Sequence, residues 1–151
     1  MGLLTTEMLS HIGATLPPVR FEVSRNDLRK YAVATGQRQA RFINGDEAPL
    51  LFLFSLLMPV VPLDALLEDG HKPDDALVPE LPLKRILAGG SAYQVHGKIL
   101  AGEVLLFRQT LADMYEKQGS DGPLIFLVFE NRFESVTGEP LVTERLTRIA
   151  R

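Results

Sequence analysis

Residues 48–61 read Ala-Pro-Leu-Leu-Phe-Leu-Phe-Ser-Leu-Leu-Met-Pro-Val-Val, and every residue between the two prolines except Ser55 is apolar. Such a segment cannot face water on any side. Pro49 suits the first position of a helix because proline has no N–H to leave unsatisfied there, and Pro59 would end that helix. We therefore predict a short central helix, apolar all round and wrapped by other elements. The run is too short and too broken by prolines to span a membrane, which takes roughly 20 apolar residues.

Length and composition predict one soluble domain, because 151 residues with a hydrophobic fraction of 46% can bury a core. The net charge is −3 and both signs are interspersed, so no basic stripe indicates a nucleic-acid partner. The absence of cysteine excludes disulfides, thiol-ligated metals and a cysteine nucleophile. The three histidines, His11, His71 and His96, are far apart in sequence, which disfavours a metal site, and we expect no cofactor.

The first third of the chain predicts an extension, a strand and a helix. Met1–Leu9 lacks the basic region and the long apolar core of a secretion signal, so we expect a cytoplasmic protein with no membrane association. Residues 1–17 form an N-terminal extension. Apolar and charged residues alternate over Val19–Val23, which predicts a half-buried strand. Ser24 is the predicted N-cap of a helix that ends before a polar loop at residues 37–47.

The rest of the chain predicts a sheet. Residues 59–82 hold five prolines and form a long Pro-rich excursion with one helical turn at Leu63–Leu67. Later runs separated by glycine-containing turns predict strands at Lys84–Leu87, Ser91–Ile99, Val104–Tyr115, Leu124–Phe133 and Leu141–Ile149. The last three are long and should form an antiparallel meander. A curved antiparallel sheet around one apolar helix is the hot-dog fold, of class α+β, here predicted as a single domain over residues 1–151.

Two stretches carry a family resemblance. Residues 31–42 read Tyr-Ala-Val-Ala-Thr-Gly-Gln-Arg-Gln-Ala-Arg-Phe and resemble the signature of the MaoC-like dehydratases and R-specific enoyl-CoA hydratases. That signature is an aromatic residue, three residues, Ser or Thr, Gly, Asp, any residue, Asn, Pro, any residue and His. Tyr31, Thr35 and Gly36 match it. Residues 87–103, with their Gly-Gly pair and a later His, are similar to the N-terminal, substrate-holding half of double-hot-dog relatives, and the resemblance extends over residues 18–151.

The departures from the signature lie at the two positions that are catalytic in the family. Gln37 stands where the family has Asp, and Phe42 stands where it has His. In the family these two groups form a dyad that activates water and moves the proton at the α-carbon of a thioester. Glutamine cannot ionise and phenylalanine has no proton to exchange, and acid–base groups contribute roughly 10²–10⁴-fold in rate. The resemblance therefore implies a subunit that holds an acyl-CoA or acyl-carrier-protein thioester, paired as a homodimer or as a heterodimer with a catalytic hot-dog subunit.

The same resemblance implies substrate-binding residues but no catalytic residue in this chain. The substrate-binding candidates are Tyr31, Thr35, Gly36, Gln37, Phe42, Gly89, Gly90, Tyr93 and His96. Each has a structural alternative. His96 either lines the acyl site or is a hydrogen-bonded strand histidine, and Gln37 either meets a thioester carbonyl or is a solvated loop amide. The Gly89-Gly90 pair either admits a ligand to the backbone or marks a bulge.

Three other functions stay open. The first is a non-enzymatic, homodimeric module that binds acyl-CoA or lipid. The second is a hot-dog thioesterase; the absence of an acid in the apolar run disfavours it, although Glu47 or Asp64 could reach a site from outside the helix. The third is an independent enzyme that uses His96 with Tyr93 or a nearby carboxylate.

Overall fold

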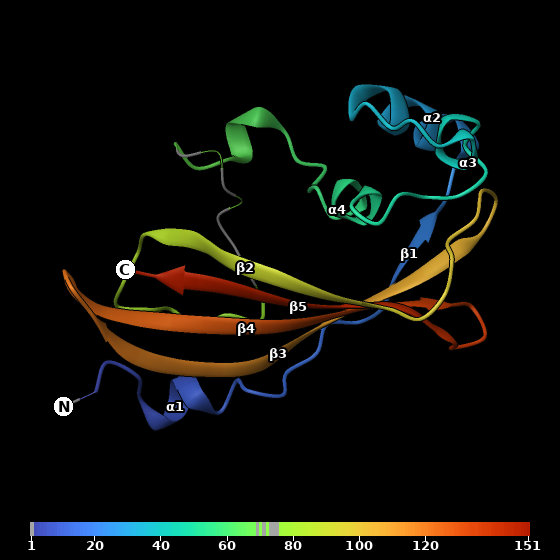
Figure 1. Ribbon diagram of the computed structural model, residues 1–151. Coiled ribbons are helices and arrows are strands. Elements are labelled where there is room, and N and C mark those ends of the chain that lie inside the picture. Colours follow the sequence, from blue (N-terminus) through green and yellow to red (C-terminus); the bar gives the residue numbers. More distant parts are fainter. Residues whose placement is uncertain (1, 69, 71, 73–75) are drawn as a thin grey trace.

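A single curved antiparallel sheet forms the body of the molecule. The structure is a computed structural model, which describes residues 2–68, 70, 72 and 76–151 (Figure 1). Within these residues the sheet has five strands: β1 (Val19–Glu22), β2 (Ile86–Val95), β3 (Val104–Gly119), β4 (Gly122–Ser135) and β5 (Pro140–Ala150). Their order across the sheet is β1-β3-β4-β5-β2. The predicted meander is therefore confirmed as β3-β4-β5, and β1 and β2 form the two edges.

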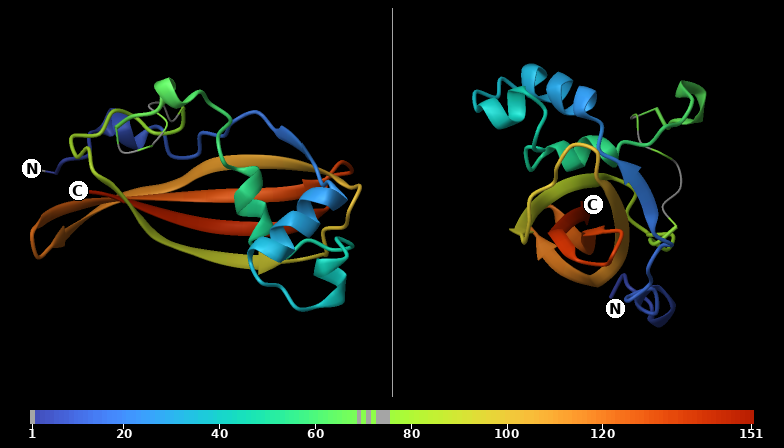
Figure 2. Two further views of the ribbon diagram at one scale, coloured as in Figure 1. Left: turned by 90° about the horizontal axis from the view of Figure 1, so that it is seen from above. Right: turned by 90° about the vertical axis from the view of Figure 1, so that its right-hand side faces the viewer.

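The helices are short except for one. They are α1 (Thr6–Leu9), α2 (Arg25–Ala34), α3 (Ala40–Ile43) and α4 (Phe52–Leu56), with a 3-10 turn at Leu63–Ala65. α2 begins as predicted, because the Ser24 side chain accepts a hydrogen bond of 3.3 Å from the Asp27 N–H. α2, α3 and α4 lie together over one end of the sheet, while α1 lies beside β3 at the other end (Figures 1 and 2).

One face of the sheet carries two apolar clusters, one near each end of the strands. The first joins Phe107, Phe133 and Val142 of the sheet to Phe52 and Leu53 of the α4 helix. The second is built on other residues of β3, β4 and β5 and is covered by residues 77–83 and by the N-terminal extension. The sheet curls strongly (Figure 2, right), so different segments of the chain cover the two ends of the same face. The predicted core positions of β4 are buried in these clusters.

The central helix is shorter and more exposed than predicted. α4 has five residues, and only Phe52 and Leu53 are buried. Phe54 is 59% exposed and Met58 is 50% exposed, so the expectation that no side of this segment faces water is wrong for the single chain. The physical reason is that the sheet covers only one side of α4. The other side keeps its apolar side chains and lacks a cover among the described residues.

Two other local predictions are wrong, and one is confirmed. The expected break between two strands at Gly89-Gly90 is a β-bulge within one continuous strand, because Ala88 pairs with Arg148 and Gly90 with Thr147, which leaves Gly89 unpaired. The expected loop at residues 37–47 contains the helix α3. The helical turn expected within the Pro-rich excursion is present at Leu63–Ala65.

Candidate functional site

The segment that resembles the hydratase signature forms the end of α2 and the turn after it. Thr35 is the C-cap residue, and its Oγ1 donates a 2.8 Å hydrogen bond to the Tyr31 carbonyl. Gly36 has φ 66°, a left-handed conformation that glycine adopts without strain. The Gln37 N–H then donates to the Ala32 carbonyl at 2.9 Å, which closes the helix end. Thr35 and Gly36 therefore have a structural task in ending the helix.

The two positions that depart from the signature lie on either side of this turn. The Gln37 side chain is half-buried, and its Nε2 lies 3.4 Å from Thr35 Oγ1. Phe42 is half-buried on α3, with the Arg41 guanidinium 4.6 Å from its ring centroid. Neither side chain can take up or release a proton near neutral pH. The Gln37 amide can form hydrogen bonds with a bound molecule, and the Phe42 ring can form apolar contacts with it.

A groove of about 370 Å³ brings Phe42 and His96 together. One wall comes from the chain between α3 and α4, and the other from the end of β2 and the residues after it. The walls are mostly apolar, and their main members are Phe42, Pro49, Leu50, Val95, His96 and Lys98. Glu47 also lines the groove and forms ion pairs at 3.4 Å with Arg41 and with Lys98. This arrangement can hold an apolar chain beneath a charged rim.

His96 stands at the rim of this groove. Its ring Nε2 lies 3.2 Å from Thr143 Oγ1 on the neighbouring strand β5, and its backbone N–H donates to the Leu141 carbonyl at 2.9 Å. The imidazole is exposed. The close side-chain partner of the ring is a neutral hydroxyl, and among the described residues no carboxylate is hydrogen-bonded to it to orient it as a general base.

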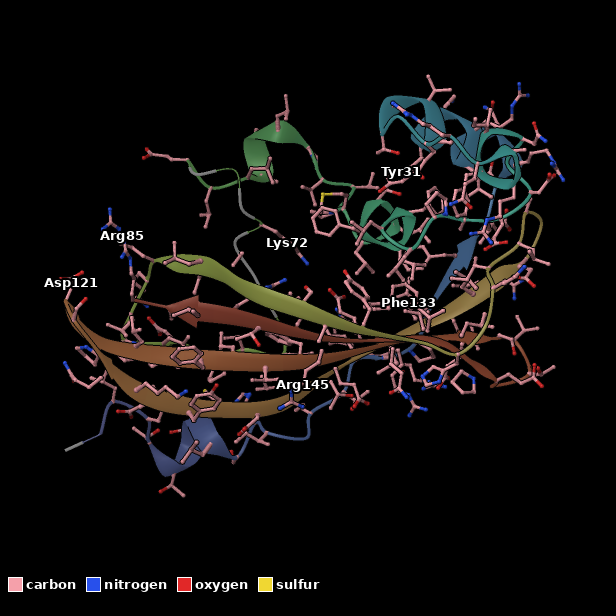
Figure 3. All side chains as sticks on the ribbon, viewed as in Figure 1. Tyr31, Lys72, Arg85, Asp121, Phe133 and Arg145 are labelled. Atoms are coloured by element: carbon pink, nitrogen blue, oxygen red, sulfur yellow. The ribbon has the colours of Figure 1, made fainter. Side chains whose placement is uncertain are left out.

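Tyr31 and Tyr93 both lie against the first apolar cluster, beside the buried side of α4. The Tyr31 ring packs edge-on against Phe52, with centroids 5.6 Å apart, and both tyrosines pack against the first apolar cluster. Burial, a hydrogen bond to Glu144 and the proximity of Tyr31 are among the causes that raise the pKa of Tyr93 to about 12. Figure 3 shows Tyr31 and Phe133 on the helix side of the sheet, with Arg145 on the other side. The structure thus joins two parts of the predicted site that are sixty residues apart in sequence.

A row of four polar residues crosses the sheet next to this junction. Gln109, Asn131, Glu144 and Tyr93 are direct cross-strand neighbours on β3, β4, β5 and β2. Gln109 Nε2 donates to Asn131 Oδ1 at 2.9 Å, and Asn131 Nδ2 donates to Glu144 Oε2 at 2.8 Å. Asn131 is 0% exposed and Glu144 is 5% exposed. The row lies between the two apolar clusters, where polar groups are stable only when hydrogen-bonded.

Sequence reasoning missed this row. The signal was available at Asn131, which interrupts the otherwise apolar positions Ile125, Leu127, Phe129 and Phe133 on one face of β4. A buried amide at such a position requires partners on the neighbouring strands. The partners could not be named without the register of the sheet.

The glycine pair lies away from the groove. A Cβ at Gly89 would come within 3.0 Å of the Thr147 carbonyl oxygen, so the glycine is required by the neighbouring strand. Gly90 has φ 138° and open space at its Cβ position. The bulge alternative therefore accounts for the pair, and a ligand role stays a prediction.

Other parts of the described chain add little chemistry. A second hollow of about 480 Å³ lies at the opposite end of the sheet, where Arg85 and Asp121 are found (Figure 3), and none of the predicted site residues lines it. Among the described residues no group of three or more His, Asp or Glu side chains is placed to hold a metal ion. None of the described helices is long and apolar enough to cross a membrane. His71 lies outside the described residues.

Comparison with known families decides the relationship. Residues 10–144 match the model of the FAS1-like dehydratase domain region. The chain belongs to this dehydratase family. Its predicted resemblance to the MaoC-like dehydratases is confirmed, and this chain is a hot-dog dehydratase domain. None of the curated proteins matches it in sequence.

Solved structures share the fold of this dehydratase domain. The HadBC (3R-hydroxyacyl-ACP dehydratase) complex from Mycobacterium tuberculosis matches with a TM-score of 0.63 and 21% identity, over 96% of this chain and 99% of that chain. The MaoC-like dehydratase from Rhodospirillum rubrum matches with 0.60 and 13% identity, over 92% and 91%. The ChsH1-ChsH2 complex from Mycobacterium tuberculosis matches with 0.61 and 13% identity, over 95% and 86%. These likenesses confirm the predicted hot-dog fold.

Proposed function

We propose that this dehydratase domain is the subunit that holds the acyl chain of an acyl-CoA or acyl-carrier-protein thioester, while a partner hot-dog subunit supplies the acid–base pair. The observation that carries the proposal is the signature turn itself. The turn keeps Tyr31, Thr35 and Gly36 in an ordered helix end but presents Gln37 and Phe42 at the positions where the family has its Asp and His. The apolar groove below Phe42 supports a role in holding the chain.

The need for a partner is supported by the open edge of the sheet. β2 has ten residues and carries no charged side chain, and among the described strands it pairs with β5 alone. Exposed and uncharged edge strands are pairing sites that single chains usually protect with charge, proline or a covering element. Beside this edge Phe54 of α4 and Met58, which follows the helix, are exposed. A second hot-dog domain that adds a strand to β2 and covers α4 would bury both features.

The charges that flank β2 favour a partner of a different sequence. Lys84 and Arg85 precede the strand, and Lys98 follows it. Two copies paired antiparallel along β2 would bring the basic start of one strand beside the basic end of the other, and like charges opposite each other destabilise a strand pair. Both lysines already hold ion pairs with glutamates of this chain, which reduces the repulsion. The HadBC and ChsH1-ChsH2 relatives are complexes of two different chains, as their names state.

The test is hydration of a short enoyl-CoA by this chain alone, by a hot-dog chain with an intact Asp and His signature alone, and by their mixture. The mixture should be much more active than this chain. Phe54→Asp should lower the activity of the mixture and weaken the complex in sedimentation. Val136→Asp is the matched control, because Val136 is 56% exposed in the β4–β5 turn. Activity of the isolated chain equal to that of the mixture would overturn the proposal.

A second candidate function rests on Glu47. This carboxylate lines the groove next to the start of the apolar run, where a hot-dog thioesterase would need an acid. Its ion pairs with Arg41 and Lys98 hold the carboxylate at the wall of the groove. Hydrolysis of acyl-CoA by the purified chain, abolished by Glu47→Gln, would favour this alternative over the subunit proposal.

A further inference from the structure

We propose that the hollow at the start of β2 binds a carboxylate of the partner hot-dog subunit, so that two arginines of this chain select a partner with an acidic residue at the end of its edge strand. The inference rests on the proposed pairing along β2 and deepens it, because it names the chemistry of the contact. The observation behind it is that Arg85 and Arg151 lie directly opposite each other.

Arg85 and Arg151 extend the ladder between β2 and β5 by one residue. The Arg85 N–H donates to the Arg151 carbonyl at 3.1 Å, and the Arg151 N–H donates to the Arg85 carbonyl at 2.9 Å. Residues that exchange both backbone bonds in this way are direct cross-strand partners, with Cα atoms about 5.5 Å apart and side chains on the same face. Two guanidinium groups therefore leave the sheet side by side, and like charges directly opposite each other destabilise a strand pair.

This repulsion is not relieved by an ion pair within the described part of the chain. Among the described residues no carboxylate forms an ion pair with Arg85 or Arg151. By contrast, Lys84 and Lys98, which also flank β2, are each ion-paired with a glutamate of this chain. Both arginines are exposed, so an anion from outside the chain can reach them.

The two arginines line the hollow of about 480 Å³ at this end of the sheet (Figure 3). Leu83 and Leu124 give it apolar walls, and the β3–β4 turn closes one side. Asp121 of this turn also lines the hollow, but it is exposed, and one carboxylate against two guanidinium groups leaves the hollow net positive. Because arginine binds carboxylates in a two-point geometry, the hollow suits an acidic side chain.

The position of the hollow identifies the occupant. β2 is an edge strand, and a strand added antiparallel along its open side ends beside the start of β2. The end of the partner's edge strand therefore lies next to Arg85. A second copy of this chain would bring the cation Lys98 to this place, whereas a partner with Asp or Glu there would neutralise the arginine pair.

The test measures, by sedimentation, the affinity of the full chain for a hot-dog chain with an intact Asp and His signature. Arg85→Gln and Arg151→Gln should each weaken the complex about tenfold. The loss should shrink between about 0.1 M and about 1 M NaCl, because the Debye length falls from about 10 Å to about 3 Å. Arg20→Gln is the matched control and should leave the affinity unchanged, because Arg20 is an exposed arginine on β1 at the opposite edge of the sheet.

Two further measurements separate a binding role from a structural one. In the isolated chain Arg85→Gln removes one of two like charges, so the midpoint of urea unfolding should rise slightly while the complex weakens. A purely structural role would lower both. Arg85→Glu should weaken the complex further, and replacing the acidic residue at the end of the partner's edge strand by lysine should restore it.

The failures of the two proposals are distinguishable. Unchanged affinity of Arg85→Gln and Arg151→Gln, in a complex that Phe54→Asp disrupts, would overturn this inference and leave the proposed function standing. Binding of inorganic phosphate to the isolated chain, abolished by Arg85→Gln while the complex is unaffected, would assign the hollow to a free anion and also overturn it. Absence of any complex with the wild-type chain would overturn the proposed function and this inference with it.

Discussion

Replacing Asn131 by leucine tests whether the polar row holds the four strands in register. Asn131 is fully buried and makes two side-chain hydrogen bonds, one from Gln109 and one to Glu144. Leucine has a similar size and can make neither bond. The substitution therefore removes the middle of the row while it leaves the buried carboxylate in place.

The size of the effect follows from the two lost bonds. The bond to the Glu144 carboxylate is charge-assisted and contributes about 1.5–3 kcal/mol, and the bond from Gln109 contributes about 1 kcal/mol. Gln109 is half-buried and can turn toward water, whereas Glu144 cannot. Burial of the leucine side chain returns about 1 kcal/mol. We expect Asn131→Leu to lower the free energy of unfolding by about 2 kcal/mol.

The double variant Asn131→Leu with Glu144→Leu makes the reasoning specific. It removes the buried charge together with its donor, and an apolar replacement of a whole buried polar pair is often close to neutral. The double variant should therefore be about 2 kcal/mol more stable than Asn131→Leu alone. Val136→Ala, at an exposed turn position, should change stability by less than about 0.5 kcal/mol.

The assay is urea unfolding at a fixed protein concentration, followed by circular dichroism. Equal slopes for the variants would show that the unfolded states are comparable. The reasoning is refuted if Asn131→Leu loses less than about 1 kcal/mol, or if the double variant is less stable than the single one.

Three further predictions concern other parts of the molecule. Gly45→Ala should destabilise the chain by more than about 2 kcal/mol, because a Cβ would lie 2.6 Å from the Arg25 carbonyl oxygen at φ 70°. Gly36→Ala, at φ 66° with open space around it, should cost only about 1 kcal/mol in the same urea titration, and equal losses would contradict the steric argument. Phe54→Ser should leave unfolding nearly unchanged but reduce assembly measured by light scattering, since the side chain is exposed in the single chain. The pKa of Tyr93 is about 12 in the folded chain and 10 in the unfolded chain, so the free energy of unfolding should be constant below pH 10 and fall as the pH rises toward 12. The absorbance step of the Tyr93 phenolate in the same pH range should be missing in Tyr93→Phe.

Local features of the fold were predictable from the sequence. The start of α2 follows from Ser24, because an N-cap side chain acts on an N–H three residues away. The meander follows from alternation and turn residues. The exposure of Phe54 could not be predicted. An apolar residue in the sequence favours burial, but the sequence does not show whether this chain or another chain buries it.

The candidate site was predictable only in part. The resemblance of residues 31–42 pointed to Tyr31 and that of residues 87–103 to Tyr93, but their proximity depends on how α2 and β2 pack against α4. Glu144 and Asn131 were missed because their partners are set by strand register. Register is a non-local property that no short stretch of sequence specifies.

The unpaired Gly89 adds one residue to β2 that has no counterpart on β5. Side chains alternate between the two faces of a strand, yet Ala88 and Ser91 face the same side because one residue between them is extra. Deleting Gly89 would therefore keep Tyr93 opposite Glu144 and Val95 opposite Val142, and it would remove only the bulge from this edge of the sheet. The edge strand can thus lose one residue in evolution without exchanging any side chain on its inner face.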